Sequence, residues 1–77
     1  MSIKVKLLAS LADRFGAREL ELDHTPGLTV RDVWDRATAG APYVSNTLSA
    51  LNQEYSTAQA AVGDGDEVAF FPPVTGG

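Results

Sequence analysis

The chain has 77 residues, a formal net charge of -4 and no Cys. The lack of Cys excludes a disulfide framework, a thiolate metal site and a persulfide held on a side chain, and a single His excludes a histidine-based metal cluster. A composition of 44% hydrophobic and 21% charged residues is typical of a folded domain with one modest core. No apolar run approaches the ~20 residues of a membrane span and no basic-then-apolar leader is seen, so we expect one soluble cytoplasmic domain over residues 1–77.

The charges are unevenly distributed along the chain. Residues 1–36 contain every Lys and Arg and have no net charge. The charged side chains of residues 37–77 are all acidic, so this part of the chain carries the whole -4. Such a surface repels phosphate backbones, which argues against nucleic-acid binding. It favours either a partner with a basic face or a purely solubilising role.

The first half of the chain predicts a strand, a short helix and a second strand. Residues 2–7 and 18–23 alternate between apolar and polar side chains, as half-buried strands do. Between them, residues 8–15 place apolar side chains at helical spacing, and Gly16 is a typical C-terminal stop. Residues 24–27 have the composition of a turn.

The principal helix has the clearest start signal in the sequence. Thr29 is a good N-cap, and Asp32 in the first turn suits the helix dipole. One apolar stripe follows at i, i+3, i+4 and i+7: Val30, Val33, Trp34 and Ala37. We therefore expect a helix that packs on the core through Trp34 and ends near Gly40.

The second half of the chain predicts three further strands. Residues 47–51 and a short segment around Tyr55 flank a tight turn at residues 52–53, and residues 67–71 are dense in β-forming side chains. Two prolines stop this last strand because neither ring nitrogen can donate to a ladder. The fold class is thus α+β: a mixed sheet of four to five strands, covered by one main helix plus a short helix, with the first and last strands as parallel neighbours.

The sequence does not contain the residues of a self-contained enzyme. His24 lies in a turn and is the one His, so a Ser-His-Asp triad is not expected. Residues 63–67 lack the later ligands of a calcium loop, and no glycine cluster lies between a strand and a helix to bind phosphate. We expect neither a bound cofactor nor a bound metal.

The last six residues are the chemically informative part of the chain. An extended segment over residues 72–77 projects about 20 Å at ~3.3 Å per residue, and we expect it to be flexible in the free protein. Gly76 and Gly77 have no Cβ and can thread a narrow channel. A terminal carboxylate that is first activated as an acyl-adenylate can be attacked by sulfur, and a chain without Cys can carry sulfur only in this way.

Residues 64–77, together with Asn52-Gln53, closely resemble the C-terminal signature of the molybdopterin synthase small subunits, sulfur carriers of the ThiS/MoaD ubiquitin-like family. The resemblance implies a β-grasp fold and adenylation of Gly77 by an activating enzyme that consumes ATP. It further implies a thiocarboxylate at Gly77, delivered to a cyclic pyranopterin precursor inside the synthase large subunit, with two small subunits flanking a large-subunit dimer. The residues implied to thread the partner's active site are Pro73, Val74, Thr75 and Gly76.

Neighbouring aromatic residues indicate a docking surface. Phe70 and Phe71 are adjacent in a strand and therefore point to opposite faces of the sheet, so that only one of them packs under the helix. We expect Phe71 to be partly exposed and to form, with Leu8 and Tyr55, a patch that resembles the family's contact surface with its partner.

Three other functions remain open from the sequence. A thiamine-pathway sulfur carrier shares the fold, the terminus and the activation chemistry. A ubiquitin-like modifier is joined through Gly77 to lysines of target proteins. A non-covalent binding module has an inert tail. The three differ in what becomes of the terminal carboxylate after incubation with ATP and an adenylating partner.

Overall fold

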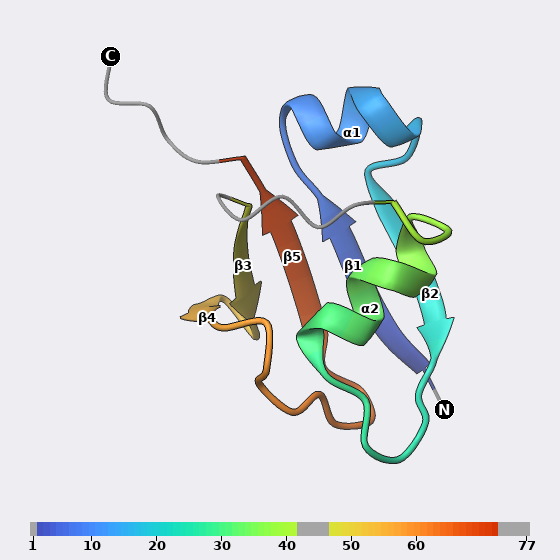
Figure 1. The fold of residues 1–77 in the computed structure, drawn as a ribbon, viewed down its shortest axis with the longest axis vertical. Coiled ribbons are helices and arrows are strands. Elements are labelled where there is room, and N and C mark those ends of the chain that lie inside the picture. The colour runs from blue at the N-terminus through green and yellow to red at the C-terminus, as the bar shows by residue number, and fades with distance from the viewer. Residues whose placement is uncertain (1, 42–46, 73–77) are drawn as a thin grey trace.

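The computed structural model describes residues 2–41 and 47–72 of the chain, which form one sheet and two helices (Figure 1). The elements, in chain order, are β1 (Ser2–Leu7), α1 (Ser10–Phe15), β2 (Glu19–Asp23), α2 (Val30–Ala37), β3 (Leu48–Leu51), β4 (Glu54–Ser56) and β5 (Glu67–Phe71). These bounds agree with the sequence-based elements except at their ends. Leu8 lies outside α1 because its backbone N–H donates to the Phe70 carbonyl at 3.0 Å and so prolongs the contact between β1 and β5.

The five strands lie in the order β2-β1-β5-β3-β4. β1 pairs with β2 antiparallel and with β5 parallel, and β3 is antiparallel to both β5 and β4. The first and last strands are thus central neighbours, as the sequence predicts, and the mixed sheet with its crossing helix is a ubiquitin-like β-grasp.

Capping residues explain where α1 ends and where α2 begins. α1 ends at Gly16, which adopts φ 71°, a left-handed conformation that glycine adopts without steric cost. α2 begins at a reciprocal capping box: the Asp32 N–H donates to Thr29 Oγ1 at 3.2 Å, and the Thr29 N–H donates to Asp32 Oδ2 at 3.0 Å. Asp32 therefore acts through a direct hydrogen bond as well as through the helix dipole that the sequence indicated.

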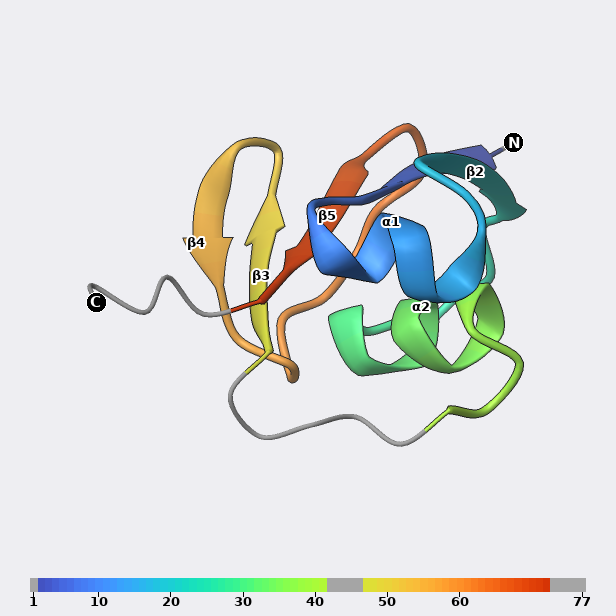
Figure 2. The same ribbon diagram turned by 90° about the horizontal axis from the view of Figure 1, so that it is seen from above.

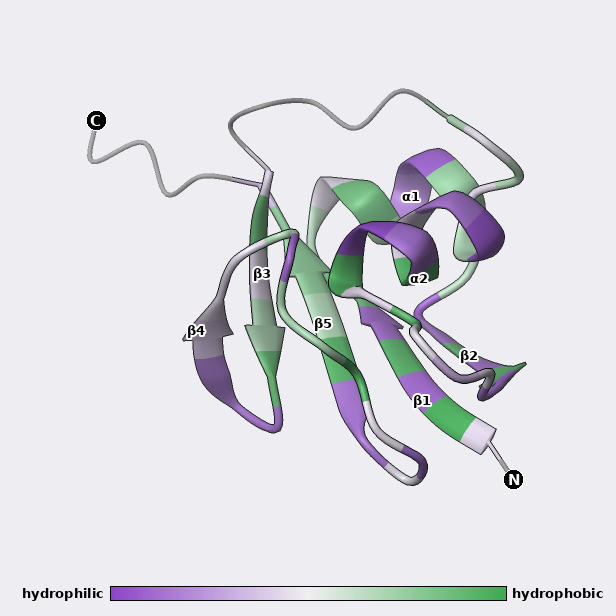
Figure 3. Ribbon diagram, turned by 60° about the horizontal axis from the view of Figure 1, so that its bottom comes forward, coloured by the Kyte–Doolittle hydropathy of each residue, from purple (hydrophilic) through white to green (hydrophobic). Residues whose placement is uncertain are grey.

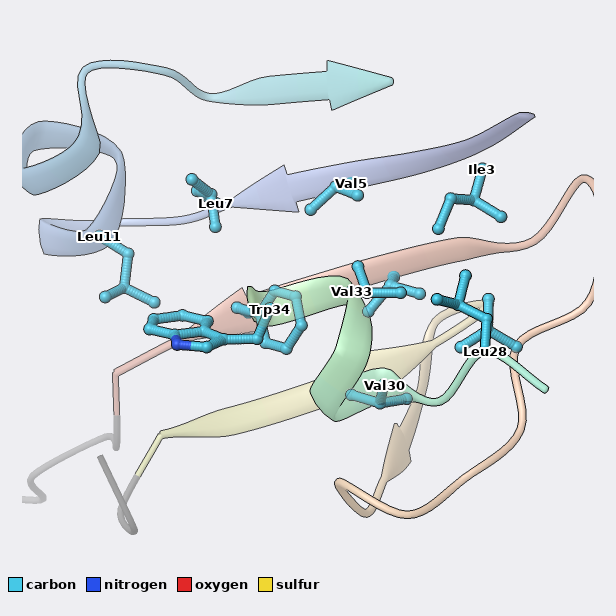
Figure 4. Close-up of a cluster of buried hydrophobic side chains, with 11 residues drawn as sticks. Ile3, Val5, Leu7, Leu11, Leu28, Val30, Val33 and Trp34 are labelled. Atoms are coloured by element: carbon cyan, nitrogen blue, oxygen red, sulfur yellow. The ribbon is translucent and has the colours of Figure 1, made fainter. Parts of the chain in front are cut away.

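The core lies between the helices and one face of the sheet. Trp34 of α2 is fully buried beside Leu7 of β1 and Leu11 of α1 (Figure 4). Its ring meets Phe70 edge to face with ring centroids 5.1 Å apart, and its indole N–H donates to the Ala41 carbonyl at 2.9 Å. The expectation that Trp34 belongs to the core is confirmed.

The other face of the sheet is covered by no helix in the part of the chain that the structure describes, because α1 and α2 lie on the same side (Figure 2). Hydropathy alternates residue by residue along β1 (Figure 3), so every second side chain points to this uncovered face, here called the open face. Neither described helix has the length and apolarity that a membrane-crossing segment needs.

Candidate functional site: the open face of the sheet

Three predicted interface residues lie near the end of β5. Phe70 is buried under the helices, whereas Phe71 is half-buried and points the other way, as its alternation with Phe70 requires. Tyr55 is 79% exposed and its ring centroid lies 5.9 Å from that of Phe71; Leu8 is 43% exposed. Exposed apolar side chains that gather on one face are more typical of an interaction surface than are exposed apolar residues that lie singly.

Strand register adds three residues that the sequence analysis missed. Leu48 is the cross-strand partner of Phe71, and Ala50 is the partner of both Tyr55 and Ala69. Directly opposed residues lie on the same face of a sheet, so these side chains extend the surface. We call this surface the apolar half of the open face: Leu8, Leu48, Ala50, Tyr55, Ala69 and Phe71. The parity of Ala69 with Phe71 could be read from the sequence, but the pairing of β3 with β5 could not.

The remaining part of the open face, over β1 and β2, is charged. Lys4 and Lys6 alternate with the buried residues of β1 and pair with Glu19 at 3.8 Å and Glu67 at 3.6 Å. Glu21 lies directly opposite Lys4. These exposed pairs are worth little individually, but they neutralise both lysines and leave the face with an acidic excess.

A hydrogen-bond network fixes the opposite end of β5, far from Phe71. Asn52 donates through Nδ2 to Asp66 Oδ1 at 3.1 Å, and its Oδ1 accepts from the Glu67 N–H at 3.0 Å. The Gly63 N–H donates to Asp66 Oδ2 at 2.7 Å. The Gly63 bond, followed by the Asn52 bond and a smaller attraction to His24, holds the pKa of Asp66 below its usual value. Within the Asn52-Gln53 turn, Asn52 therefore fastens the hairpin of β3 and β4 to the start of β5 by side-chain bonds, in addition to the backbone pairing of β3 with β5.

His24 also contributes to this end of the molecule. Its Nε2 lies 3.0 Å from the Val62 carbonyl and ties the turn after β2 to the segment before β5. The sequence predicted only a turn at His24, because its partner is 38 residues away.

Residues 2–41 and 47–72 contain no group of three or more His, Asp or Glu placed to hold a metal ion. The tail residues assigned from the sequence, Pro73, Val74, Thr75, Gly76 and Gly77, lie outside the described residues. The described part of the chain ends at Pro72, directly after Phe71 of the apolar half of the open face.

Comparisons with known proteins identify relatives over the whole chain. The model of the ThiS family matches residues 5–77. The molybdopterin synthase sulfur carrier subunit of Arabidopsis thaliana is 35% identical over 81 residues, which cover 100% of this chain and 84% of the relative. The subunit of the same name from Chlamydomonas reinhardtii is 35% identical over 83 residues and is covered completely.

Solved structures of similar sequence have the same fold as this chain. SAMP1 from Haloferax volcanii superposes with a TM-score of 0.82 at 31% identity, with both chains covered completely. A putative molybdopterin converting factor subunit 1 from Pyrococcus furiosus has a TM-score of 0.78 at 28% identity and covers 96% of this chain and 99% of its own. In fold, sequence and length the chain thus belongs to the ThiS family, together with the sulfur carrier subunits of molybdopterin synthase.

Proposed function

We propose that this chain is a cytoplasmic sulfur carrier of molybdenum cofactor biosynthesis, the non-catalytic small subunit of a molybdopterin synthase. The observation that carries the proposal is similarity over the whole chain to carrier subunits of that enzyme, with a ThiS family match that runs through Gly76 and Gly77. The chain itself binds no cofactor in this scheme; ATP is consumed by the activating enzyme.

The proposed chemistry takes place at the carboxylate of Gly77. A carboxylate oxygen attacks the α-phosphorus of ATP, which releases pyrophosphate and leaves an acyl-adenylate. Hydrosulfide supplied by a sulfur donor then attacks the carbonyl carbon; the C–S bond forms, the C–O bond to AMP breaks, and AMP leaves with the electron pair. The thiocarboxylate sulfur then attacks a carbon of the cyclic pyranopterin precursor within the large subunit and displaces an oxygen leaving group from it. Water attacks the acyl carbon of Gly77, the bond from that carbon to sulfur breaks, and the carboxylate is restored while the sulfur stays on the precursor.

The proposed docking surface for the large subunit is the apolar half of the open face. Leu8, Tyr55 and Phe71 are exposed or half-exposed there and lie beside the end of β5, from which the tail continues. A complex of subunits 1 and 2 of molybdopterin-converting factor is known from Helicobacter pylori, and that subunit 1 has the same fold. We propose the same pairing here, with two small and two large subunits.

Intact-mass spectrometry tests the carrier chemistry. The purified chain is incubated with ATP, Mg²⁺, an adenylating partner and a sulfur donor, beside a matched variant that lacks Gly77. The carrier assignment predicts the mass change of one oxygen-for-sulfur exchange in the full chain alone. An unchanged mass in an assay whose positive-control carrier is converted would contradict it.

The docking surface has its own test. Phe71→Arg places a charge in the apolar half and should abolish binding to the large subunit, whereas Gln59→Arg adds the same charge at an exposed position of the loop before β5 and should not. Equal binding by both variants would refute this docking surface.

A second candidate function, attachment to lysines of other proteins through Gly77, is favoured by the similarity to SAMP1, a small archaeal modifier protein by name. The same adenylate would then be attacked by a lysine amine, and an isopeptide adduct would form in place of the thiocarboxylate. Denaturing electrophoresis of the reaction with a cell extract distinguishes the two, because only the modifier becomes covalently joined to larger proteins.

A further inference from the structure

A cavity of about 410 Å³ lies at the end of the sheet where β1 and β5 finish. Its lining residues come from β1 and the loop after it, from α1, and from the residue before β2: Leu7, Leu8, Ala9, Ala12, Asp13 and Arg18. Leu8 also belongs to the apolar half of the open face, so that the cavity and the docking surface share a wall. α1 stands above this end of the sheet (Figure 1).

Arg18 is the cation of this cavity. Lys4, Lys6 and Arg31 each pair with a carboxylate, and the Arg14 guanidinium lies 5.1 Å from the centroid of the Phe15 ring. Within residues 2–41 and 47–72, by contrast, no carboxylate lies within 4.0 Å of the Arg18 guanidinium, although Asp13 lines the same cavity. A guanidinium beside apolar surface, with its hydrogen-bond donors unused by the protein, is suited to a carboxylate from elsewhere.

The backbone holds both walls of the cavity in place. The Leu7 N–H donates to the Arg18 carbonyl at 2.9 Å, and the Leu8 N–H donates to the Phe70 carbonyl at 3.0 Å. Ala9 adopts φ 53° and ψ -131°, a conformation that residues other than glycine rarely adopt. Strain of this kind persists where the surroundings enforce it and is frequent at binding sites.

We infer that this cavity receives a segment of the large subunit in which an apolar side chain is followed by a carboxylate. The apolar side chain packs on Leu8 and Ala12, and the carboxylate forms a bidentate pair with Arg18. Asp13 on the other wall repels the carboxylate and so sets the direction in which the segment lies. This inference rests on the proposed function, since it names the partner chemistry of a cavity that borders the proposed docking surface.

Binding kinetics with the purified large subunit test the inference in three variants. Arg18→Gln should weaken binding about 10- to 100-fold, the effect expected for loss of a hydrogen-bonded charge pair. Arg36→Gln is the matched control: it removes an exposed arginine of α2, away from the cavity, and should bind as the parent does. Arg18→Lys keeps the charge without the bidentate geometry and should recover part of the loss.

The rate constants separate a seated ion pair from general attraction. Loss of a buried pair raises the dissociation rate, whereas loss of a steering charge lowers the association rate and its salt dependence. A change confined to the association rate, or an equal effect of Arg18→Gln and Arg36→Gln, would overturn the inference.

Comparison with Phe71→Arg shows whether the cavity inference alone is wrong or the proposed docking surface is wrong as well. If Phe71→Arg abolishes binding and Arg18→Gln leaves it unchanged, the cavity has no such occupant while the docking surface stands. If binding is unchanged in both variants, the docking surface fails as well. Because the Arg18 side chain is exposed, thermal unfolding of Arg18→Gln should match the parent and exclude a folding defect.

Discussion

Replacing Asn52 by Ala tests whether the Asn52-Gln53 turn fastens the hairpin to β5. The substitution removes two side-chain hydrogen bonds, one to Asp66 and one from the Glu67 N–H. Exposed hydrogen bonds contribute about 0.5 to 1 kcal/mol each, at the lower end of the usual range. Asn52 also adopts φ 52°, where alanine costs about 1 kcal/mol more than asparagine. The free energy of unfolding should therefore fall by about 2 to 3 kcal/mol.

Such a loss is large for a chain of this size. A domain of 77 residues has a stability of about 4 to 11 kcal/mol, and 1 kcal/mol changes the melting temperature by roughly 4 to 8 °C. Thermal and urea unfolding followed by circular dichroism should show a fall of about 10 to 20 °C in Asn52→Ala. Gln53→Ala is the matched control, because Gln53 shares the turn and its left-handed backbone but makes no side-chain hydrogen bond among the described residues.

The stability lost in Asn52→Ala should also depend on pH. Hydrogen bonds from Gly63 and Asn52 lower the pKa of Asp66 in the folded state. A carboxylate with a lowered pKa stabilises the fold above its unfolded pKa of about 4, and this stabilisation is lost as the pH falls through the folded value. Asn52→Ala removes one of the two donors, so the stability difference between parent and variant should narrow as the pH falls below about 5. A cost in Asn52→Ala no larger than in Gln53→Ala, or a difference that stays constant in acid, would refute the role assigned to the network.

Three further substitutions test local backbone and capping arguments by urea unfolding. Gln53→Gly should stabilise the protein by about 0.5 to 1 kcal/mol, because φ 71° in a two-residue hairpin turn favours glycine; a lower midpoint would contradict a left-handed Gln53. Ala9→Gly should add about 1 kcal/mol by relieving the conformation at φ 53° and ψ -131°, and destabilisation there would show that the backbone is not strained. Thr29→Ala should cost about 1 kcal/mol through loss of the capping box, whereas Thr29→Ser should retain most of the stability.

The position of the network bears on the proposed function. Asn52 and Asp66 anchor the start of β5, and the apolar half of the open face lies around its end. Because a strand is stiff along its length and its register with β1 and β3 is set by backbone hydrogen bonds, fixing one end determines where the other end presents Phe71. The lowered stability of Asn52→Ala should thus be accompanied by weaker binding to the proposed large-subunit partner, even though Asn52 is remote from the proposed docking surface.

The sequence by itself determined the features that depend on near neighbours. Period-two alternation identified the strands and placed Phe70 and Phe71 on opposite faces, since successive side chains of a strand must point to opposite sides. Helical spacing identified the buried face of α2, including Trp34, and Gly16 marked the end of α1. The terminal glycines and the absence of Cys directed attention to the last carboxylate, where the proposed chemistry takes place.

Only the tertiary structure decided which distant residues meet. Asn52 is hydrogen-bonded to Asp66, 14 residues later in the sequence, and His24 to the carbonyl of Val62, 38 residues later. The register of β3 with β5 places Leu48 opposite Phe71. Among the described residues no carboxylate pairs with Arg18, and this, like the strained backbone of Ala9, depends on how β1, α1 and β2 pack at one end of the sheet. Side-chain periodicity is a local property of the chain, whereas a surface is assembled from strands that are neighbours only after folding. The sequence therefore predicted the exposure of Phe71 but neither the other members of the apolar half of the open face that strand pairing adds nor the cavity beside it.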